Sequence, residues 1–416
     1  MTKALTIIIQ HTAADPQVRR DETLSLIRAA LYQAVCDTTV RLREPRAATY
    51  ITPAAIEMID ALVQTHEPDV IIVDDSLTGV QQRQLQRAWD CTVLDRPGLI
   101  LRIFLRRASS RIAKLQVRRA QLAYQRTRLV REWTHLERQR AVSFIGGPGE
   151  TQLEIDRRLL DQKIDKIDAQ LQSARRTRQL NRQVRRHLPS LALVGYTNAG
   201  KSSLFNLLTS EKRPSRNQVF TTLDSATRKI SGTNVTITDT IGFISELPPQ
   251  LVNAFHATLE EVTQADVILH VHDIASPARE DHDRDVTQIL QQIGVNAARQ
   301  PIIDVWNKID LLPDKDHAIL LRQAKQAGAI ALSTRSQQGL DDLHRRLTEV
   351  IERSWQKVSL RFEASRGDLW SFLHSKGRVT AYRRQGKRLY VTARLDVTSL
   401  GQLQDRFQDV ALRVHL

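Results

Sequence analysis

The sequence predicts a mixed α/β protein in which a domain built around a phosphate-binding loop is joined to a long antiparallel helical hairpin. Three observations support this prediction: a strand-like run at 191–194 leads into a glycine-rich loop, leucine recurs every seven residues from Leu115 to Leu136, and apolar strands alternate with helix-like stretches near both ends. The expected units are an α/β domain at 1–98, a basic helical hairpin with a glycine-rich tip at 99–188, a domain with a doubly wound sheet at 189–355, and a small α+β module at 356–416.

Residues 1–98 read as a small α/β domain. The runs 5–9 and 70–73 are apolar enough for buried strands, whereas 22–34 and 53–63 have helix-like composition. Strands that alternate with helices are typical of a sheet that helices cover.

The segment from 101 to 190 is helical and strongly basic. It holds 22 lysines and arginines against 8 acidic residues, a net charge of +14 that accounts for nearly all of the chain's +15. The leucine heptads and a second apolar repeat from Leu160 to Ala174 predict two helices of roughly 35 residues, each about 50 Å long. The break at 146–149 cannot continue a helix, and 151–154 reads as a capping box that starts the second arm.

This basic hairpin has two interpretations. It is either a solvated coiled coil that packs on the phosphate-binding domain, or a probe for structured RNA, because arginine binds phosphates in a bidentate way and stacks on unpaired bases. We favour the second interpretation. The predicted RNA contacts are Gly146, Gly147, Pro148 and Gly149 at the tip, with Arg118, Arg119, Arg175 and Arg176 on the arms.

The loop that follows 191–194 matches the pattern of glycine, four residues, glycine, lysine, and serine or threonine. Its glycines let backbone N–H groups curl around phosphate oxygens, Lys201 adds a positive charge beside the β and γ phosphates, and Ser202 offers a hydroxyl to Mg²⁺. A glycine-rich turn without a ligand is the alternative, but a chance match is rare at average residue usage. The predicted nucleotide contacts of the loop are Gly195, Tyr196, Thr197, Asn198, Ala199, Gly200, Lys201, Ser202 and Ser203.

The base is predicted from the run Asn307, Lys308, Ile309 and Asp310, which follows a strand-like segment. A carboxylate at the fourth position can accept hydrogen bonds from guanine N1–H and N2–H₂, whereas adenine has no such pair of donors. Asp310 is therefore expected to select guanine. Asn307, Lys308, Ser333 and Thr334 complete the predicted base site, with Ser333 supporting the guanine through its backbone.

Between these motifs lies Asp239-Thr240-Ile241-Gly242, preceded by an alternating strand-like run. Asp239 at the strand end is predicted to hold Mg²⁺ through water, together with Ser202 and Thr222, and Gly242 to donate its N–H to the γ phosphate. Thr222 is the candidate switch residue, and Thr221 is its nearest rival. The order and separation of the motifs predict a GTPase, for which Lys201, Thr222 and Gly242 are the catalytic candidates.

The C-terminal residues 356–416 read as a β-α-β-β module with a turn at 385–387. The composition of the whole chain adds exclusions: 416 residues hold only Cys36 and Cys91, too few for a disulfide framework. No apolar run approaches the roughly 18 residues of a membrane helix, and the first ten residues read as a strand, not a secretory signal. We expect a monomeric cytoplasmic protein that does not insert into membranes.

The stretches around the motifs carry a closer resemblance. Residues 147–154 with 156–158, 220–224 and 239–248 are similar to the HflX family of ribosome-associated GTPases, and the similarity extends upstream to 74–77, 81–83 and 115–117. The resemblance covers most of residues 70 to 350. It implies that the hairpin and its tip enter the large ribosomal subunit toward the peptidyl-transferase centre, where they contact ribosomal RNA. It also implies dissociation of stalled or idle ribosomes under stress.

Two features bear on hydrolysis. Many regulatory GTPases place a glutamine after Asp-x-x-Gly to orient the attacking water, but here the residue is Phe243, which has neither donor nor acceptor. Intrinsic hydrolysis is therefore expected to be slow until a partner completes the site, unless Phe243 merely packs in a competent enzyme. The resemblance to HflX implies that this partner is the ribosome. Asn198 resembles the asparagine of potassium-activated relatives, so K⁺ is a further candidate cofactor besides Mg²⁺; the alternative is that Asn198 ties the loop backbone together.

His270 and His272 lie two apart on a predicted strand, face the same side, and could share a metal ion. Two histidines without a nearby cysteine make a poor site, so we prefer packing against a neighbouring helix. Two alternatives to the ribosome-splitting function stay open: a checkpoint in large-subunit assembly, which binds immature particles, and a helicase-like RNA-remodelling enzyme, which also uses ATP.

Overall fold

A computed structural model describes residues 2–10, 16–140, 152–183, 189–210, 220, 226–233, 235–245, 259, 261–296, 300–353, 355–395, 397–407 and 409–415. The predicted tip at 146–149, the predicted helix cap at Thr151 and the switch candidates Thr221 and Thr222 lie outside these residues. Within them, no helix is both long enough and apolar enough to cross a membrane. The chain is of the mixed α/β class, with three separate sheets.

The N-terminal sheet is parallel, with strand order β2-β1-β3-β4. Its side chains alternate between two layers: Ile72 faces the cluster that includes helices α1 and α4, and Ile71 faces the cluster that includes α2 and α3. The elements are β1 (Thr2–Gln10), α1 (Pro16–Ala29), β2 (Tyr32–Arg41), α2 (Pro53–His66), β3 (Val70–Val73), α3 (Gly79–Trp89), β4 (Thr92–Asp95) and α4 (Arg96–Arg107).

The predicted helix at 22–34 was wrong at its C-terminal end. Helix α1 ends at Ala29, and the chain turns into the edge strand β2, which pairs along the whole of β1. Most of β2 is half-buried or exposed, so it lacks the apolar run that marked β1 and β3. The predicted boundary at 98 also falls inside α4, a helix that packs against both the N-terminal elements and α5 of the hairpin.

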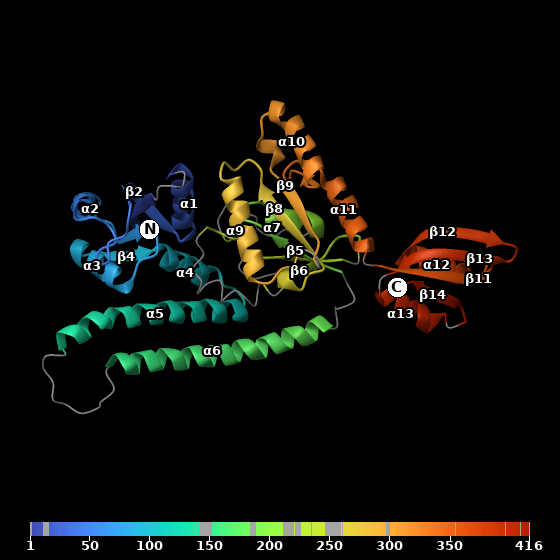
Figure 1. Cartoon of the computed structure of the whole chain (residues 1–416), viewed down its shortest axis with the longest axis horizontal. Coiled ribbons are helices and arrows are strands. Elements are labelled where there is room, and N and C mark those ends of the chain that lie inside the picture. The colour runs from blue at the N-terminus through green and yellow to red at the C-terminus, as the bar shows by residue number, and fades with distance from the viewer. Residues whose placement is uncertain are drawn as a thin grey trace.

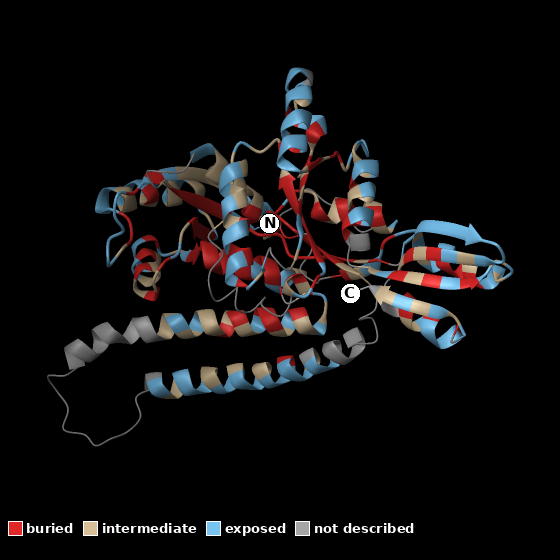
Figure 2. Ribbon diagram, turned by 45° about the vertical axis from the view of Figure 1, so that its right-hand side comes forward, coloured by how far each residue is buried: buried red, intermediate tan, exposed pale blue. Residues whose placement is uncertain are grey.

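The hairpin consists of α5 (Arg111–Arg140) and α6 (Gln152–Gln183), which run side by side in opposite directions (Figure 1). The 30 and 32 residues correspond to about 45–48 Å. Buried Val117 and Leu122 of α5 face the rest of the protein, whereas α6 lies on the outside and is largely exposed (Figure 2). Ion pairs cross between the helices, from Arg119 to Asp168 and from Arg126 to Asp161.

The central sheet has the order β10-β9-β8-β5-β7-β6, with β6 antiparallel to β7 and the other pairs parallel. Alternating residues of β5 face opposite layers: Leu193 packs with α7 and α11, and Val194 packs in the layer of α9, as a doubly wound sheet requires. The elements are β5 (Ser190–Val194), α7 (Lys201–Thr209), β6 (Ala226–Lys229), β7 (Thr236–Asp239), β8 (Val267–Asp273), α9 (Arg279–Gln292), β9 (Ile302–Asn307), α10 (Asp314–Ala327), β10 (Ile330–Ala331) and α11 (Leu340–Arg353).

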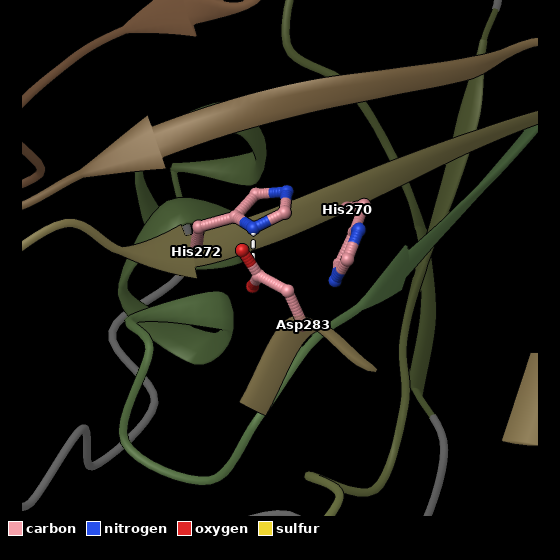
Figure 3. Close-up of side chains that lie close together, drawn as sticks. All are labelled: His270, His272 and Asp283. Carbon is pink, nitrogen blue, oxygen red and sulfur yellow. Dashed lines mark hydrogen bonds and ion pairs between the residues drawn. The ribbon is translucent and has the colours of Figure 1, made fainter. Parts of the chain in front are cut away.

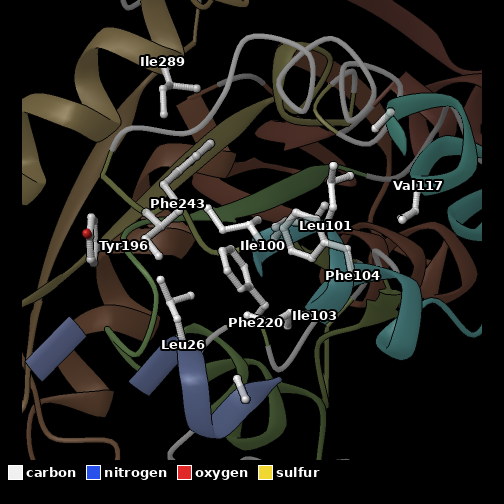
Figure 4. Close-up of a cluster of buried hydrophobic side chains, with 14 of the residues drawn as sticks. Leu26, Ile100, Leu101, Ile103, Phe104, Val117, Tyr196, Phe220, Phe243 and Ile289 are labelled. Atoms are coloured by element: carbon white, nitrogen blue, oxygen red, sulfur yellow. The ribbon is translucent and has the colours of Figure 1, made fainter. Parts of the chain in front are cut away.

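A single apolar core joins the N-terminal domain, the hairpin and the central domain (Figure 4). Phe104 of α4 meets Phe220 edge to face, with ring centroids 4.5 Å apart. Val117 of α5 and Phe243, which follows Asp-x-x-Gly, belong to the same cluster. The parts of the chain around the predicted switches are therefore packed against the other two units.

The C-terminal module contains more than the predicted β-α-β-β set. Its antiparallel sheet has the order β12-β13-β11-β14, and the unpredicted α13 and β14 extend it. The elements are β11 (Gln356–Glu363), α12 (Gly367–Lys376), β12 (Gly377–Gln385), β13 (Arg388–Leu395), α13 (Val397–Arg406) and β14 (Ala411–His415).

Candidate nucleotide site

The phosphate-binding loop connects β5 to α7, and its two outer glycines are required by space as well as by conformation. Gly195 has φ +147°, and a Cβ there would lie 2.2 Å from the carbonyl oxygen of Val271. Gly200 has φ +99°, and its Cβ would lie 2.1 Å from the side-chain amide nitrogen of Asn307. No other residue type fits these two positions without moving the backbone or the base loop.

Lys201 is buried at the start of α7. Its Nζ donates to the carbonyl oxygens of Gly195, at 2.9 Å, and Tyr196, at 2.6 Å. Burial lowers the pKa of this amine; Asp239 opposes the change, Lys308 adds to it, and the net result is a pKa of about 8. The loop thus holds a positive charge in a desolvated position that favours an anionic ligand.

The predicted Mg²⁺ residues Ser202 and Asp239 meet at the end of β7. Ser202 Oγ donates to Asp239 Oδ2 at 2.8 Å, and Asp239 is fully buried. Gly242 lies beside them, since a Cβ on it would be 3.0 Å from Lys201 Nζ and 2.9 Å from Thr197 Cγ2. A hydroxyl and a carboxylate next to the lysine fit the oxygen preference of Mg²⁺.

The base loops are tied to the phosphate loop through one buried amide. Asn307 Nδ2 donates to the carbonyl of Ala199 at 2.8 Å, and its Oδ1 accepts from Thr334 N–H at 3.0 Å. Ser333 Oγ donates to Asp310 Oδ1 at 2.6 Å and accepts from the N–H of Ser336 at 3.0 Å. The structure therefore brings together three parts of the predicted site that are distant in sequence: the phosphate loop, the run 307–310 and the segment 333–334.

Lys308 has a partner that the motif analysis missed. Its Nζ forms a 2.6 Å ion pair with Asp273 Oδ2 at the end of β8. Lys308 also has φ +67°, a conformation uncommon for residues other than glycine. Asp273 follows an apolar strand, but nothing in the local sequence marks it as the partner of a lysine 35 positions away.

Phe243 is held over the phosphate loop by backbone pairing. Thr197 N–H donates to the carbonyl of Phe243 at 2.6 Å, and Phe243 N–H donates to that of Gly195 at 3.1 Å. The ring of Phe243 is 2% exposed and lies in the core shared with the N-terminal domain. The side chain thus packs among apolar residues, and its backbone couples the two loops.

The side chain of Tyr196 leaves the nucleotide loop and binds the N-terminal domain. Its hydroxyl donates to Glu22 of α1 and accepts from Ser245 N–H at 2.8 Å, and its ring stacks on His282 of α9 at 3.6 Å. Burial raises the pKa of Tyr196 well above its ordinary value, and Glu22 adds to the effect. Sequence analysis assigned only a nucleotide contact to this residue.

Arg96 completes this interdomain contact and was also missed. Its guanidinium is 2% exposed and pairs with Asp74 at 2.6 Å and Glu22 at 2.8 Å, and it donates to the carbonyl of Ser245 at 3.3 Å. Burial opposes its charge, but the carboxylates of Asp74 and Glu22 outweigh burial and raise its pKa. We call Glu22, Arg96, Tyr196 and Ser245 the interdomain latch.

The two histidines of β8 lie among carboxylates. His272 Nδ1 is 2.6 Å from Asp283 of α9 (Figure 3). Its Nε2 is 3.0 Å from Asp304 of β9. Burial would lower the pKa of His272, but the hydrogen bonds to Asp283 and Asp304 outweigh it and raise the pKa to about 8. Burial lowers the pKa of His270.

The hairpin surface keeps part of the predicted basic set exposed. Arg118 and Arg176 are exposed, whereas Arg119 is half-buried in its ion pair with Asp168. Arg128 is turned inward, where it pairs with Asp95. The side chain of Arg175 lies outside the described residues. Further exposed basic residues are Arg157, Arg158, Lys163 and Lys166 on α6.

The doubly wound sheet, the glycine loop at the end of β5 and the guanine-type base loop define a P-loop GTPase. Family models agree along the chain: a GTP-binding GTPase N-terminal region matches 17–105, a GTP-binding GTPase middle region 107–185, and a 50S ribosome-binding GTPase domain 190–308. A solved complex of SsGBP with GDP has the same fold, with a TM-score of 0.50 at 23% identity over 84% of this chain and 98% of that one.

Whole-length relatives make the assignment specific. The chain is 38% identical to a GTPase HflX of Magnetococcus marinus over 97% of its own length and 95% of the relative's. It is also 38% identical to the GTPase HflX of Escherichia coli over 89% and 87% of the two chains. The chain belongs to the HflX family, and it is a GTP hydrolase.

Proposed function

We propose that this GTPase binds the large ribosomal subunit and, under stress, dissociates or recycles stalled or idle ribosomes, with hydrolysis stimulated by the ribosome. The observation that carries this proposal is the basic hairpin, whose base shares one apolar core with Phe220 and Phe243 beside the switches. An RNA-binding arm and the nucleotide site are thereby in direct mechanical contact. The match to a 50S ribosome-binding GTPase domain supports the choice of partner.

In this proposal each part of the site has one task. The backbone of the loop from Gly195 to Ser203 holds the phosphates, and Lys201 neutralises their charge. Asp310 accepts hydrogen bonds from guanine, while Asn307, Lys308, Ser333 and Thr334 hold the base loops in place. This assignment uses the hydrogen bonds that already connect Asn307 to both neighbouring loops.

Mg²⁺ would be held by Ser202 directly, by Asp239 through water, and by Thr222. When bound there, the ion would supply positive charge that offsets the negative charge developing on the phosphates during transfer. Support comes from the 2.8 Å contact between Ser202 Oγ and Asp239 Oδ2, which places two hard oxygen donors together. Asn198, at φ +63°, remains our candidate for a K⁺ ligand through its side-chain oxygen.

In this scheme GTP hydrolysis is slow until the protein binds the ribosome. Phe243 cannot orient water, and its ring is buried in the shared core. Gly242 N–H would contact the γ phosphate, so GTP would draw this segment toward the nucleotide and disturb the pairing of Phe243 with Gly195 and Thr197. The segment continues to Ser245 in the interdomain latch, and this connection would transmit the nucleotide state to the hairpin.

The direct test is GTP hydrolysis with and without purified large ribosomal subunits, with Lys201→Ala as the blank and ATP as a competitor. Strong stimulation that is specific for GTP is expected. Equal turnover with and without subunits contradicts ribosome gating. Competition by ATP favours an RNA-remodelling enzyme, and preferential binding to immature particles favours an assembly checkpoint.

The hairpin surface has its own test. The triple variant Arg118→Glu, Lys163→Glu and Lys166→Glu should lose cosedimentation with ribosomes but retain GTP binding, because phosphate contacts of exposed basic residues supply most of the affinity for RNA. The matched control is Arg345→Glu with Arg346→Glu on α11, which should cosediment normally. Unchanged cosedimentation of the triple variant would refute the RNA-binding role. We further propose a cytoplasmic, ribosome-associated monomer.

A further inference from the structure

The strongest unexplained cluster lies beside the nucleotide site, where β8 faces α9. His270 and His272 of β8 and Asp283 of α9 each offer one ligand atom, and these atoms lie within 4.8 Å of one another. Figure 3 shows the three side chains turned toward one another from the strand and the helix. Nothing in the proposed GTPase mechanism uses these residues.

Asp304 on the neighbouring strand sets which nitrogens are available. Its Oδ1 lies 3.0 Å from His272 Nε2 and 3.4 Å from His270 Nδ1, so both imidazoles can donate their N–H to this one carboxylate. Once His272 has lost its second proton, this arrangement leaves a lone pair on His272 Nδ1 and on His270 Nε2. A carboxylate that accepts from the outer nitrogen of a metal-bound histidine is the common second layer of zinc sites.

The second nitrogen of His270 provides an independent indication of a ligand. His270 is 5% exposed, and among the described residues its Nε2 is buried without a hydrogen-bond partner. A buried imidazole nitrogen without a partner loses its hydrogen bond to water and gains none in return, so such an atom calls for an explanation. Its position beside Asp283 and His272 matches that of a metal ligand.

We propose that His270 Nε2, His272 Nδ1 and an oxygen of Asp283 form a binding site for a divalent transition-metal ion of the Zn²⁺ type. Two nitrogens and one carboxylate oxygen suit Zn²⁺ and leave a fourth position for water. Bonds of about 2.0–2.1 Å place tetrahedral ligands roughly 3.3 Å apart, so side-chain adjustment within the 4.8 Å cluster suffices. The side chain of Asp283 is 34% exposed, which gives the ion a route from solvent.

The ion would connect β8 to α9 next to both ends of the nucleotide site. Asp273, directly after His272, pairs with Lys308 of the base loop. On α9, Asp285 accepts from Ser245 Oγ at 2.9 Å, and His282 stacks on Tyr196. Zn²⁺ is therefore expected to stabilise the nucleotide domain and the interdomain latch together. Without a metal ion, a proton on His272 holds the same two carboxylates.

The test is Zn²⁺ binding to the full-length protein, measured by competition with a chromophoric chelator and by thermal shift, with Mg²⁺ in excess. Wild type should bind one ion and melt at a higher temperature when Zn²⁺ is present. His270→Gln and His272→Gln should each weaken binding by at least about 100-fold, and Asp304→Asn by about 10–100-fold, as outer partners of metal ligands do. Co²⁺ should give the visible absorption of a tetrahedral site in wild type and lose it in both histidine variants.

Two controls separate this site from other sources of zinc binding. Asp239→Asn alters the proposed Mg²⁺ site and should leave Zn²⁺ binding intact, as should His344→Gln on α11. The inference is overturned if wild type binds no Zn²⁺ at sub-millimolar concentrations, or if the stoichiometry and affinity are the same in wild type and both histidine variants. Loss of binding in Asp239→Asn alone would assign the ion to the nucleotide site instead.

Discussion

The hydroxyl oxygen of Tyr196 connects the nucleotide loop to the N-terminal domain, and its removal tests how much this contact stabilises the protein. It donates to Glu22 and accepts from the N–H of Ser245 at 2.8 Å, and the residue is 7% exposed. The substitution Tyr196→Phe removes this oxygen and keeps the ring that stacks on His282. Any loss of stability therefore reports the hydrogen bonds and not the packing.

The expected loss of stability in Tyr196→Phe depends on the polar groups that lose the tyrosine hydroxyl as their hydrogen-bond partner. Ser245 N–H loses its acceptor in a half-buried place, and Glu22 loses one donor but keeps Arg96 at 2.8 Å. One buried group without a partner costs about 1–3 kcal/mol. For a domain of this size each kcal/mol lowers the melting temperature by about 2–4 °C, so a decrease of roughly 2–12 °C is expected.

The assay is differential scanning calorimetry of the full chain, with Tyr382→Phe as the matched control. Tyr382 is 66% exposed in the C-terminal module, so removal of its hydroxyl should change the melting temperature by less than about 1 °C. A double-mutant cycle of Tyr196→Phe with Glu22→Gln should give a coupling energy of about 0.5–3 kcal/mol. Equal melting temperatures for the two tyrosine variants, or additive effects in the cycle, would refute the reasoning.

Two further predictions concern the nucleotide. Asp310→Asn should weaken GTP binding by about 10–100-fold, because the amide cannot accept hydrogen bonds from both guanine donors. The control Asp316→Asn on α10 should bind GTP normally. Equal affinities of the two variants for a fluorescent GTP analogue would exclude base recognition by Asp310. The pKa of Lys201 is about 8 without nucleotide, and its amine must be protonated to pair with phosphates. The affinity for GTP should therefore be constant below about pH 7.5 and fall by up to tenfold per pH unit above about pH 8. Lys201→Ala should bind weakly at every pH, and a wild-type profile as flat as that of the variant would contradict the prediction.

The family assignment and the parts of the nucleotide site were available from the sequence because they depend on short motifs. The glycines at 195 and 200, with Lys201 and Ser202, specify a loop through local conformation and charge. The guanine preference follows from one carboxylate at the end of a strand. The heptad leucines indicated the two arms of the hairpin, because a helix repeats its apolar face within a few residues.

Elements that are stabilised by partners distant in the sequence were harder to predict from the sequence alone. The first residues of β2, 32–34, were predicted as the end of a helix, and the rest of the strand was not predicted. Its residues are mostly half-buried or exposed, and its pairing with β1 supplies what the local pattern lacks. In the same way, α13 and β14 were not predicted, although β14 completes the C-terminal sheet and α13 packs in the core of that module. The ion pair of Arg119 with Asp168 across the hairpin likewise depends on a partner 49 positions away, so the charge of Arg119 alone did not show that it is half-buried.

The sequence by itself determined the chemistry at the nucleotide, since glycine conformation, lysine charge and carboxylate geometry act over a few neighbouring residues. Only the tertiary structure decided which groups face one another across long separations. Tyr196 reaches Glu22 over 174 positions, and Arg96 reaches Ser245 over 149. His272 likewise becomes more than a packed histidine only because α9 and β9 bring Asp283 and Asp304 to it. Such contacts depend on the path of the whole chain, and no local pattern encodes that path.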